Sequence, residues 1–284
     1  MTSTNTVAAV PRLLGRSIER HALASSTSDL ARAHAHAGAA EGLVVLAEEQ
    51  TLGRGRRGRN WVAPPGTCLL LTVLLRPVWL PPDAAFALTM LAGVAVCDAV
   101  EASVPALHAA LKWPNDLLLP ATPLPNAPLQ KAAGILSELV LDAGQISFVT
   151  LGIGINVNWS PSGLVDGRDL GATATSLCAA AGHTVDRAAL LDALLGRIDA
   201  GYAQLRRGQR EAIFNAWRAR LVTLGHDVTV VTPSGGVTGT AEDVDATGAL
   251  RLRSNDGQLH VITAGDVGGY VGTRPTMQEP GAPS

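Results

Sequence analysis

The sequence is poor in lysine, cysteine, aromatic residues and net charge. Only Lys112 and Lys131 are lysines among 22 basic residues, aromatic residues make up 4% of the 284 positions, and the net charge is -2. A charge this close to zero argues against a general electrostatic binder of nucleic acid or of an anionic membrane. The three cysteines lie far apart without metal-ligand spacing, which excludes a disulfide framework and a cysteine zinc site. We therefore expect a reducing compartment and anion recognition confined to a local patch.

Long apolar runs are also missing. The longest are interrupted well short of the roughly 20 residues that a membrane helix needs, and the N-terminal residues lack the order of segments typical of a signal peptide. Hydrophobic residues nonetheless make up 47% of the chain, which is enough to bury a large core. These features predict a cytoplasmic globular protein with one large domain, or one large and one small domain.

Arginine is the default cation of this chain, so the two lysines stand out. Arginine can replace lysine wherever a generic surface charge suffices, whereas some sites need a compact ammonium rather than a planar fork. Lys112 and Lys131 are therefore candidate functional residues. The alternative is that these two lysines were retained by chance, without a functional requirement.

Apolar periodicity and turn signals predict a mixed α+β domain followed by a small all-β domain. A helix is expected after the hydroxyl-rich segment 25–28, ending at Gly38 or Gly42. The other expected helices cover residues 86–102, 186–204 and 211–221, and the expected strands cover 43–49, 68–75, 110–119 with a break at Pro114, 131–141 and 146–158. Beyond Gly225, four or five short alternating strands indicate a small β barrel.

These elements divide the chain into four segments. We expect an irregular segment at residues 1–22, the α+β domain at 23–222, the barrel at 223–271 and a disordered tail at 272–284. Within the larger domain, residues 120–130 contain four prolines and predict an exposed excursion.

The strongest local signal is GRGRRGR at residues 53–59, inside a loop that covers residues 50–66. Its interleaved glycines let the backbone approach a ligand closely, and arginine forks match phosphate or carboxylate oxygens. The alternatives are an RNA contact and a solvated charged loop. We favour a small anion because the loop is short, is followed by Trp61 and lies between two core strands.

The segment KWPND, residues 112–116, places a cation, a ring, a kink, an amide and a carboxylate together. Pro114 cannot lie in a central strand, so we expect a bulge that aims Asn115 and Asp116 to one side. A polar pocket is one interpretation, and a simple turn with Trp113 in the core is the other.

Two further segments can contribute polar groups. Lys131 begins a buried strand and can place its ammonium in a cleft, or it can be an exposed residue at a strand edge. The segment GIGINVN, residues 152–158, ends a strand with small residues and two amides. Its glycines allow another backbone or a ligand to approach, and a bulge with capping amides is the alternative.

Hydroxyl groups at Ser26 and Thr27 and the amide of Gln50 can bind a neutral polar group, although a helix N-cap explains the hydroxyls equally well. None of the histidines falls in a convincing acid–base or metal-binding pattern, and no serine or cysteine has the setting of a nucleophile. The chemistry predicted from the residues is charge stabilisation.

Taken in order, these motifs resemble the biotin protein ligases. The resemblance covers about residues 22–270, and it is carried by SST at 25–27, EEQTLGRGRRGRNW at 48–61, LKWPNDLLL at 111–119, KAAGILSEL at 131–139 and LGIGINVN at 151–158. It implies a catalytic domain of the class II synthetase type and an SH3-like C-terminal barrel.

The resemblance also implies a reaction with ATP, Mg²⁺ and biotin. Biotin is first activated as biotinyl-5′-AMP and is then transferred to a lysine of a biotin carboxyl carrier protein. By motif position, the biotin-binding residues are Ser26, Thr27, Ser28, Gln50, Arg54, Gly55, Arg56 and Lys131. The ATP- or adenylate-binding residues are Arg57, Arg59, Trp61, Lys112, Asn115, Asp116 and Asn156. Arg54, Arg56 and Lys131 are the expected catalytic residues, and no metal ligand is identified.

The chain departs from the family pattern in two places. Ser28 stands where the family often has asparagine, and the insertion at 120–130 separates KWPND from Lys131 more than usual. Because the motifs begin by residue 25, we expect a ligase without an N-terminal DNA-binding domain and without nucleic-acid or membrane partners. A homodimer stays open. The alternatives are a lipoate or octanoyl protein ligase and an RNA-binding module.

Overall fold

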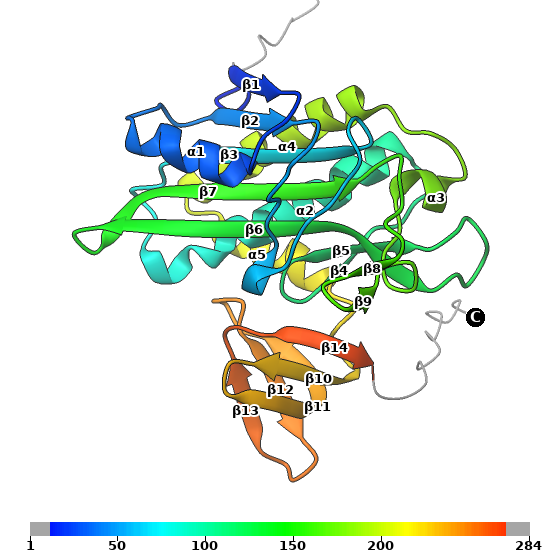
Figure 1. Cartoon of the computed structure of the whole chain (residues 1–284). Helices are drawn as coiled ribbons and strands as arrows, with labels where there is room; N and C mark the ends of the chain where they lie inside the picture. The colour runs from blue at the N-terminus through cyan, green and yellow to red at the C-terminus, as the bar shows by residue number, and fades with distance from the viewer. Residues whose placement is uncertain (1–11, 271–284) are drawn as a thin grey trace, which may run out of the picture.

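The computed structural model describes residues 12–270, and its centre is a seven-stranded mixed sheet in the order β1-β2-β3-β7-β6-β5-β4 (Figure 1). β1 pairs parallel with β2, and the other neighbouring strands are antiparallel. The strands are β1 (Ser17–His21), β2 (Leu43–Ala47), β3 (Cys68–Leu75), β4 (Ala110–Lys112), β5 (Asp116–Pro120), β6 (Leu129–Asp142) and β7 (Gln145–Asn156). The predicted α+β class is confirmed.

Strand β1 corrects the expectation that residues 1–22 are irregular. Ser17–His21 pair residue by residue with Leu43–Ala47 at the edge of the sheet. The strand carries charged residues and is only partly buried, as is common for edge strands. It therefore lacks the apolar run by which the interior strands were found. Residues 1–11 lie outside the described part of the chain.

Helices cover both faces of the sheet, and the interior strand β3 is buried throughout. Every residue of β3 is buried, which is expected of a strand covered on both sides. In Figure 1, α1 lies in front of the sheet while α2, α4 and α5 lie behind it. The helices are α1 (Thr27–His36), α2 (Phe86–Ser103), α3 (Leu177–Ala181), α4 (Arg187–Arg206) and α5 (Arg210–Ala219), with short 3-10 turns η1 (Arg56–Gly58) and η2 (Pro82–Ala84).

Two helices, α4 and α2, bury the apolar residues from which they were predicted. The predicted leucine stripe of α4 is buried, and the Asp186 carboxylate caps its first turn by accepting two backbone N–H groups. By length and composition, the helical stretch Pro82–Ser103 could cross a membrane. Its most apolar 18 residues have a mean hydropathy of 1.7, but 72% of them are buried inside the protein. It serves as the core helix of the fold.

The two predicted turns differ in outcome. The β6–β7 hairpin forms as expected around Ala143 and Gly144. Pro114 was expected in a bulge, but β4 and β5 are two antiparallel strands, with Lys112 opposite Asp116. Pro114 therefore lies in the tight turn of a hairpin, where its missing N–H costs no sheet hydrogen bond. Of the excursion predicted at 120–130, residues 121–128 lie between strands and are mostly exposed, whereas Pro120 ends β5 and Leu129 begins β6.

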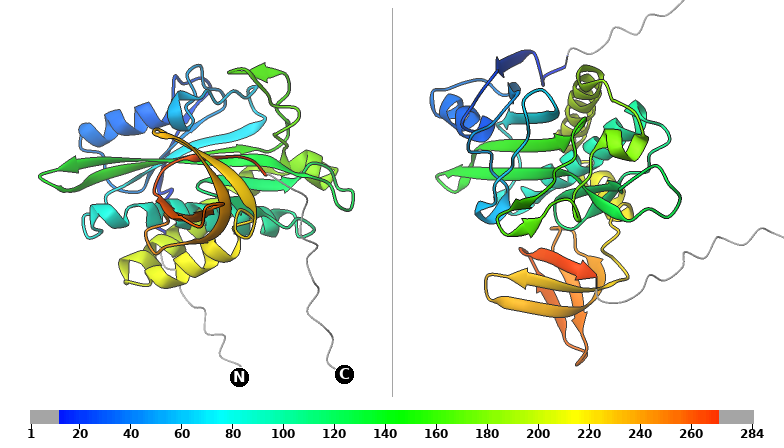
Figure 2. Two further views of the ribbon diagram at one scale, coloured as in Figure 1. Left: turned by 90° about the horizontal axis from the view of Figure 1, so that it is seen from below. Right: turned by 45° about the vertical axis from the view of Figure 1, so that its right-hand side comes forward.

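The C-terminal sheet comprises residues 227–270 and has the order β13-β12-β11-β10-β14. Its strands are β10 (Asp227–Thr232), β11 (Gly235–Val244), β12 (Leu250–Ser254), β13 (Leu259–Ile262) and β14 (Asp266–Tyr270). It lies against one side of the larger unit, below the arginine-rich loop (Figure 2). The Trp113 indole N–H donates to the Gly248 carbonyl at 2.9 Å across the contact. The expected disordered tail lies outside the described residues.

Candidate active site

A cavity of about 630 Å³ lies where the arginine loop (residues 53–61), strands β6 and β7, the β4–β5 turn and the C-terminal sheet meet. All fifteen residues predicted from the sequence line this cavity. They come from segments as distant as 26 and 156, so the fold gathers them in one place. Their individual contacts divide the cavity into a neutral end and a cationic end.

The neutral end consists of buried hydroxyl groups at the start of α1 and the half-buried side-chain amide of Gln50. The Gln50 side-chain oxygen accepts from the Thr27 backbone N–H at 2.8 Å and from the Thr27 hydroxyl at 3.1 Å. Ser28 and Thr72 lie 3.2 Å apart, oxygen to oxygen. Ser26 occupies the N-cap position with 1% exposure, yet its hydroxyl makes no capping bond. Helix capping therefore does not account for this hydroxyl, and a neutral polar ligand group fits here.

The arginine loop is itself a small hairpin. The Trp61 N–H donates to the Gly53 carbonyl at 2.8 Å, and the Gly55 N–H donates to the Arg59 carbonyl at 2.7 Å. At the tip, Arg57 and Gly58 adopt positive φ values of 58° and 71°, which glycine tolerates and other residues rarely adopt. Gly58, one of the glycines predicted to let the backbone approach a ligand, thus helps to form a tight turn.

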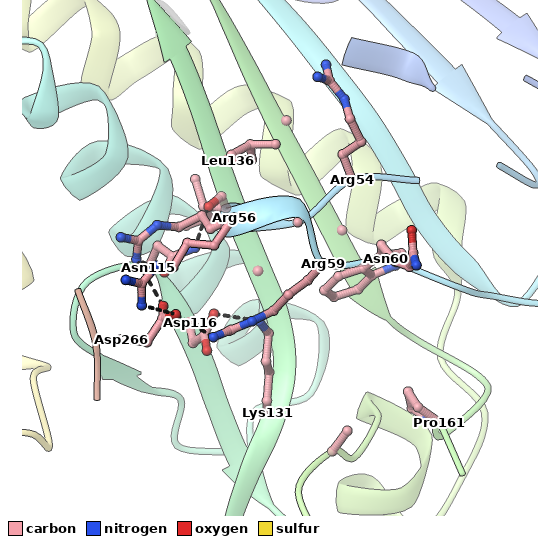
Figure 3. A pocket seen from close by; sticks show the side chains of 18 of the residues that line it. Arg54, Arg56, Arg59, Asn60, Asn115, Asp116, Lys131, Leu136, Pro161 and Asp266 are labelled. Carbon is pink, nitrogen blue, oxygen red and sulfur yellow. Dashed lines mark hydrogen bonds and ion pairs between the residues drawn. The ribbon is translucent and has the colours of Figure 1, made fainter. Parts of the chain in front are cut away.

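Three of the four loop arginines, Arg56, Arg57 and Arg59, pair with Asp266 of β14. Figure 3 shows Arg56 and Arg59 directed toward this carboxylate. The carboxylate lies 3.2 Å from Arg57 and 3.8 Å from Arg56, and it also pairs with Arg59. Burial lowers the pKa of Arg56, an effect opposed by Asp266 and Asp116. Asp266 was missed by the sequence analysis, because it is an unremarkable aspartate in a strand 200 positions from the loop.

Arg54 departs from the expected arrangement. Its guanidinium is directed away from the other arginines (Figure 3) and pairs with Asp29 at 2.7 Å and with Glu138 at 3.1 Å. By the family resemblance, Arg54 was expected to bind biotin together with Arg56. Arg54 pairs with Asn60 in the extended part of the loop hairpin, whereas Arg56 begins the 3-10 turn η1. The two side chains therefore leave the loop in different directions and meet different partners.

The two lysines lie near the same carboxylate. Lys131 Nζ is 2.6 Å from Asp116, which comes from the KWPND hairpin. Burial lowers the pKa of Lys112, while Asp116 acts in the opposite direction. The Asn115 side-chain oxygen accepts from Arg56 at 2.9 Å. KWPND therefore lines a polar pocket, and Trp113 is also in the core, so both alternatives for this segment describe part of it.

Glycines of β6 and β7 make a flat floor beneath Trp61. Gly134 and Gly154 are opposite each other in the β6–β7 pairing. A methyl group added to Gly154 would lie 2.7 Å from the Trp61 ring, and one added to Gly134 would lie 3.1 Å from it. The indole N–H of Trp61 is buried and has no hydrogen-bond partner among the described residues. The close approach predicted for the glycines of GIGINVN is made at Gly154 by a tryptophan from the arginine loop.

The amides of GIGINVN serve the scaffold as well as the cavity. Asn156 is 2% exposed and donates to the Thr175 carbonyl at 3.0 Å. Asn158 exchanges two hydrogen bonds with the backbone of Val185. Asn158 therefore acts as the backbone-capping amide that was the alternative to ligand binding. Asn156 lines the cavity, but its side-chain nitrogen already donates to Thr175.

These features define a class of enzyme that holds a neutral group at one end of a cavity and anionic groups at the other. A family profile described as the Biotin/lipoate A/B protein ligase family matches residues 21–156. A second profile, the Biotin protein ligase C terminal domain, matches residues 223–267.

Relatives narrow the class. The biotin--[acetyl-CoA-carboxylase] ligase of Mycobacterium tuberculosis is 36% identical over 86% of this chain and 85% of that protein. The enzyme of the same name from Paracoccus denitrificans is 39% identical over 78% of this chain and 88% of that protein. The chain belongs to the biotin protein ligase family. The structure of the Aquifex aeolicus biotin protein ligase in complex with biotin and ATP has the same fold, with a TM-score of 0.72 at 24% identity, covering 89% of this chain and 98% of that one.

Proposed function

We propose that the protein is an ATP-dependent biotin protein ligase. A biotin carboxylate oxygen attacks the α-phosphorus of ATP, which forms biotinyl-5′-AMP and releases pyrophosphate. The amine of a carrier-protein lysine then attacks the acyl carbon of this mixed anhydride, and AMP leaves. The single observation that supports this proposal most strongly is one cavity with uncharged hydrogen-bonding groups at one end and a cluster of cations at the other.

The neutral end is the proposed site of the biotin head group, whose amide and carbonyl groups need hydrogen-bond partners without charge. We assign it to Ser26, Thr27, Ser28 and Gln50. The cationic end would bind the biotin carboxylate through Arg56 and Lys131, with Arg54 and Gly55 at the rim. This arrangement holds the carboxylate among positive charges, which lowers the barrier to bringing it toward a phosphate.

The remaining cavity residues are assigned to the nucleotide. They are Arg57, Arg59, Trp61, Lys112, Asn115, Asp116 and Asn156. Charge stabilisation by guanidinium and ammonium groups is the main requirement of such a step, since the protein need not supply a covalent nucleophile. Arg54 is the weakest of the three expected catalytic residues, because its guanidinium is already paired outside the cationic cluster.

Magnesium is proposed to arrive with ATP. Among the described residues, no group of three or more His, Cys, Asp or Glu side chains could hold a metal ion. Mg²⁺ characteristically keeps its waters and binds through substrate phosphates plus one or two carboxylates. Asp116 is the carboxylate of the cavity that fits this role, and the ion would supply charge neutralisation at the phosphates.

We propose a biotin carboxyl carrier protein as the partner and the cytoplasm as the compartment. The absence of nucleic-acid and membrane partners and the possibility of a homodimer stay predictions. A lipoate or octanoyl ligase is the second candidate, because the first matched profile covers both biotin and lipoate ligases. The match to the biotin-specific C-terminal profile favours biotin.

The test is to incubate the purified protein with Mg²⁺, ATP and either biotin or lipoate. We expect pyrophosphate release and an isolable biotinyl-5′-AMP with biotin, followed by labelling of an added carrier protein. Labelling with lipoate alone would assign the second function. The absence of pyrophosphate release with either acid would refute both.

A further inference from the structure

A short hairpin on the cavity wall contacts the arginine loop through a single carboxylate. β8 (Leu164–Val165) pairs with β9 (Arg168–Asp169), and the two residues between them, Asp166 and Gly167, have φ values of 49° and 74°. Two successive positive φ values are typical of a type I′ turn, which Asp-Gly favours. The Asp166 carboxylate accepts from the Asn60 backbone N–H at 2.9 Å and from the Asn60 side-chain nitrogen at 3.0 Å. One side chain thus holds two donors of the loop.

The other end of this wall segment is fixed to the strand that carries Lys131. The Lys131 N–H donates to the Thr173 carbonyl at 2.9 Å, and the Thr175 N–H donates to the Lys131 carbonyl at 2.9 Å. The hairpin base is closed by the Leu170 N–H, which donates to Gly163 at 3.0 Å. The segment is therefore attached to β6 by backbone hydrogen bonds at its base and contacts Asn60 of the arginine loop through Asp166 at its tip.

We propose that Asp166 is a positioning residue that latches the arginine loop over the cavity, an inference that rests on the proposed function. A continuous set of contacts runs from the Lys131 backbone through the hairpin to Asn60, next to Arg59. When the latch is closed, the loop arginines and Lys131 are held on opposite sides of one bound anion. Asp166 does not touch the reacting atoms, and its effect is to retain the acyl adenylate until the carrier lysine arrives.

The hydrogen bonds between Asp166 and Asn60 are exposed to solvent, which is compatible with a loop that opens in each turnover. Asp166 and Asn60 are both exposed to solvent, and hydrogen bonds in such settings add little net free energy. A lid that admits two substrates and a carrier lysine in each turnover needs a closed state that is only modestly favoured. We therefore expect loss of the latch to change lid opening severalfold and to leave the fold intact.

Three variants test the contact without disturbing the turn. Asp166→Gly keeps a turn that Gly-Gly also forms and removes both acceptor oxygens. Asn60→Asp sets two carboxylates against each other. In the double variant Asp166→Asn/Asn60→Asp, the introduced amide at 166 accepts from the backbone N–H at 60 and donates to the introduced carboxylate. Both hydrogen bonds are thereby rebuilt, the side-chain bond with donor and acceptor exchanged.

Two measurements report on the latch. Trypsin cleavage within residues 54–59, measured without any ligand and located by mass, should speed up about fivefold in each single variant and return to the wild-type rate in the double variant. The release of biotinyl-5′-AMP from the protein should accelerate by a similar factor of about five, with the same rescue. The melting temperature should stay unchanged.

Asp256→Gly is the matched control, since Asp256 precedes a glycine in an exposed turn of the C-terminal sheet. It removes the same charge and should leave both rates unchanged. Equal rates in wild type and single variants, or a double variant as open as the single ones, would overturn the latch. If the wild-type protein forms no adenylate, the proposed function fails, and the trypsin result still decides whether the contact holds the loop.

Discussion

Lys131 is held between a carboxylate and an aromatic ring. Its Nζ lies 2.6 Å from Asp116 and 5.6 Å from the centre of the Trp61 ring. A compact ammonium fits this space and can exchange the carboxylate for a ligand oxygen, whereas a planar guanidinium is larger and directs its donors along a fixed fork. The scarcity of lysine in the sequence pointed to this residue. Its partner could not be predicted, because their contact depends on the shifted β5–β6 register.

Replacing Lys131 with arginine tests whether an ammonium is needed. We expect Lys131→Arg to slow pyrophosphate release about tenfold although the charge is kept, and Lys131→Met to slow it about a hundredfold. The melting temperatures of both variants should remain close to that of the wild type, because the side chain is partly exposed. Full activity of Lys131→Arg would show that any cation suffices there.

At the scale of secondary structure, glycines of β6 and β7 let the arginine loop pack directly on the sheet. Gly134 and Gly154 leave room for Trp61 to lie flat on β6 and β7. The packing of this ring links the floor of the cavity to the loop that covers it. Since the buried face of an indole contributes mainly through apolar area and van der Waals contact, a gap of a few tenths of an ångström weakens it.

A methyl group at Gly154 should therefore loosen the arginine loop. In Gly154→Ala the added carbon would lie 2.7 Å from the Trp61 ring, so the ring must lift. We expect the KM for biotin to rise about fivefold and the melting temperature to fall by a few degrees. Gly236→Ala is the control, because its nearest side-chain atom would be 3.8 Å away. Identical kinetics in the two variants would mean that Trp61 does not govern the loop.

Among the secondary structure elements, those with long apolar patterns could be predicted from the sequence, and those without such patterns could not. The β6–β7 hairpin and α4 carry continuous periodicity and were found. The β8–β9 hairpin was missed because each strand has two residues, too few to show alternation, although its Asp-Gly turn was readable. All the predicted cavity residues were brought together, but their pairings were not predictable. The direction of Arg54 and the role of Asp266 depend on contacts between segments that only the fold places together.

The whole molecule closes its cavity by joining two units. The KWPND hairpin reaches the C-terminal sheet through Trp113 and Gly248. On the outside, Arg218 of α5 pairs with Asp243 of β11 at 2.6 Å. Beside the cavity, Asp266 of β14 holds the arginine loop. The C-terminal sheet thus contributes a charged group to the cavity wall, and we expect it to influence nucleotide binding as well as stability.

Asp266→Asn separates these two effects. Without the carboxylate, three guanidinium groups lose their common partner and repel one another, so the loop is no longer held in the position that meets the phosphates. We expect the KM for ATP to rise about fivefold, because the loop must now be ordered at the time of binding. Asp243→Asn is the matched control, since it also removes an aspartate of the C-terminal sheet that pairs with an arginine of the larger unit. Both variants should lose a similar small amount of thermal stability, as expected for partly exposed ion pairs. Only Asp266→Asn should change the KM for ATP; an equal change in both would assign Asp266 to domain attachment alone.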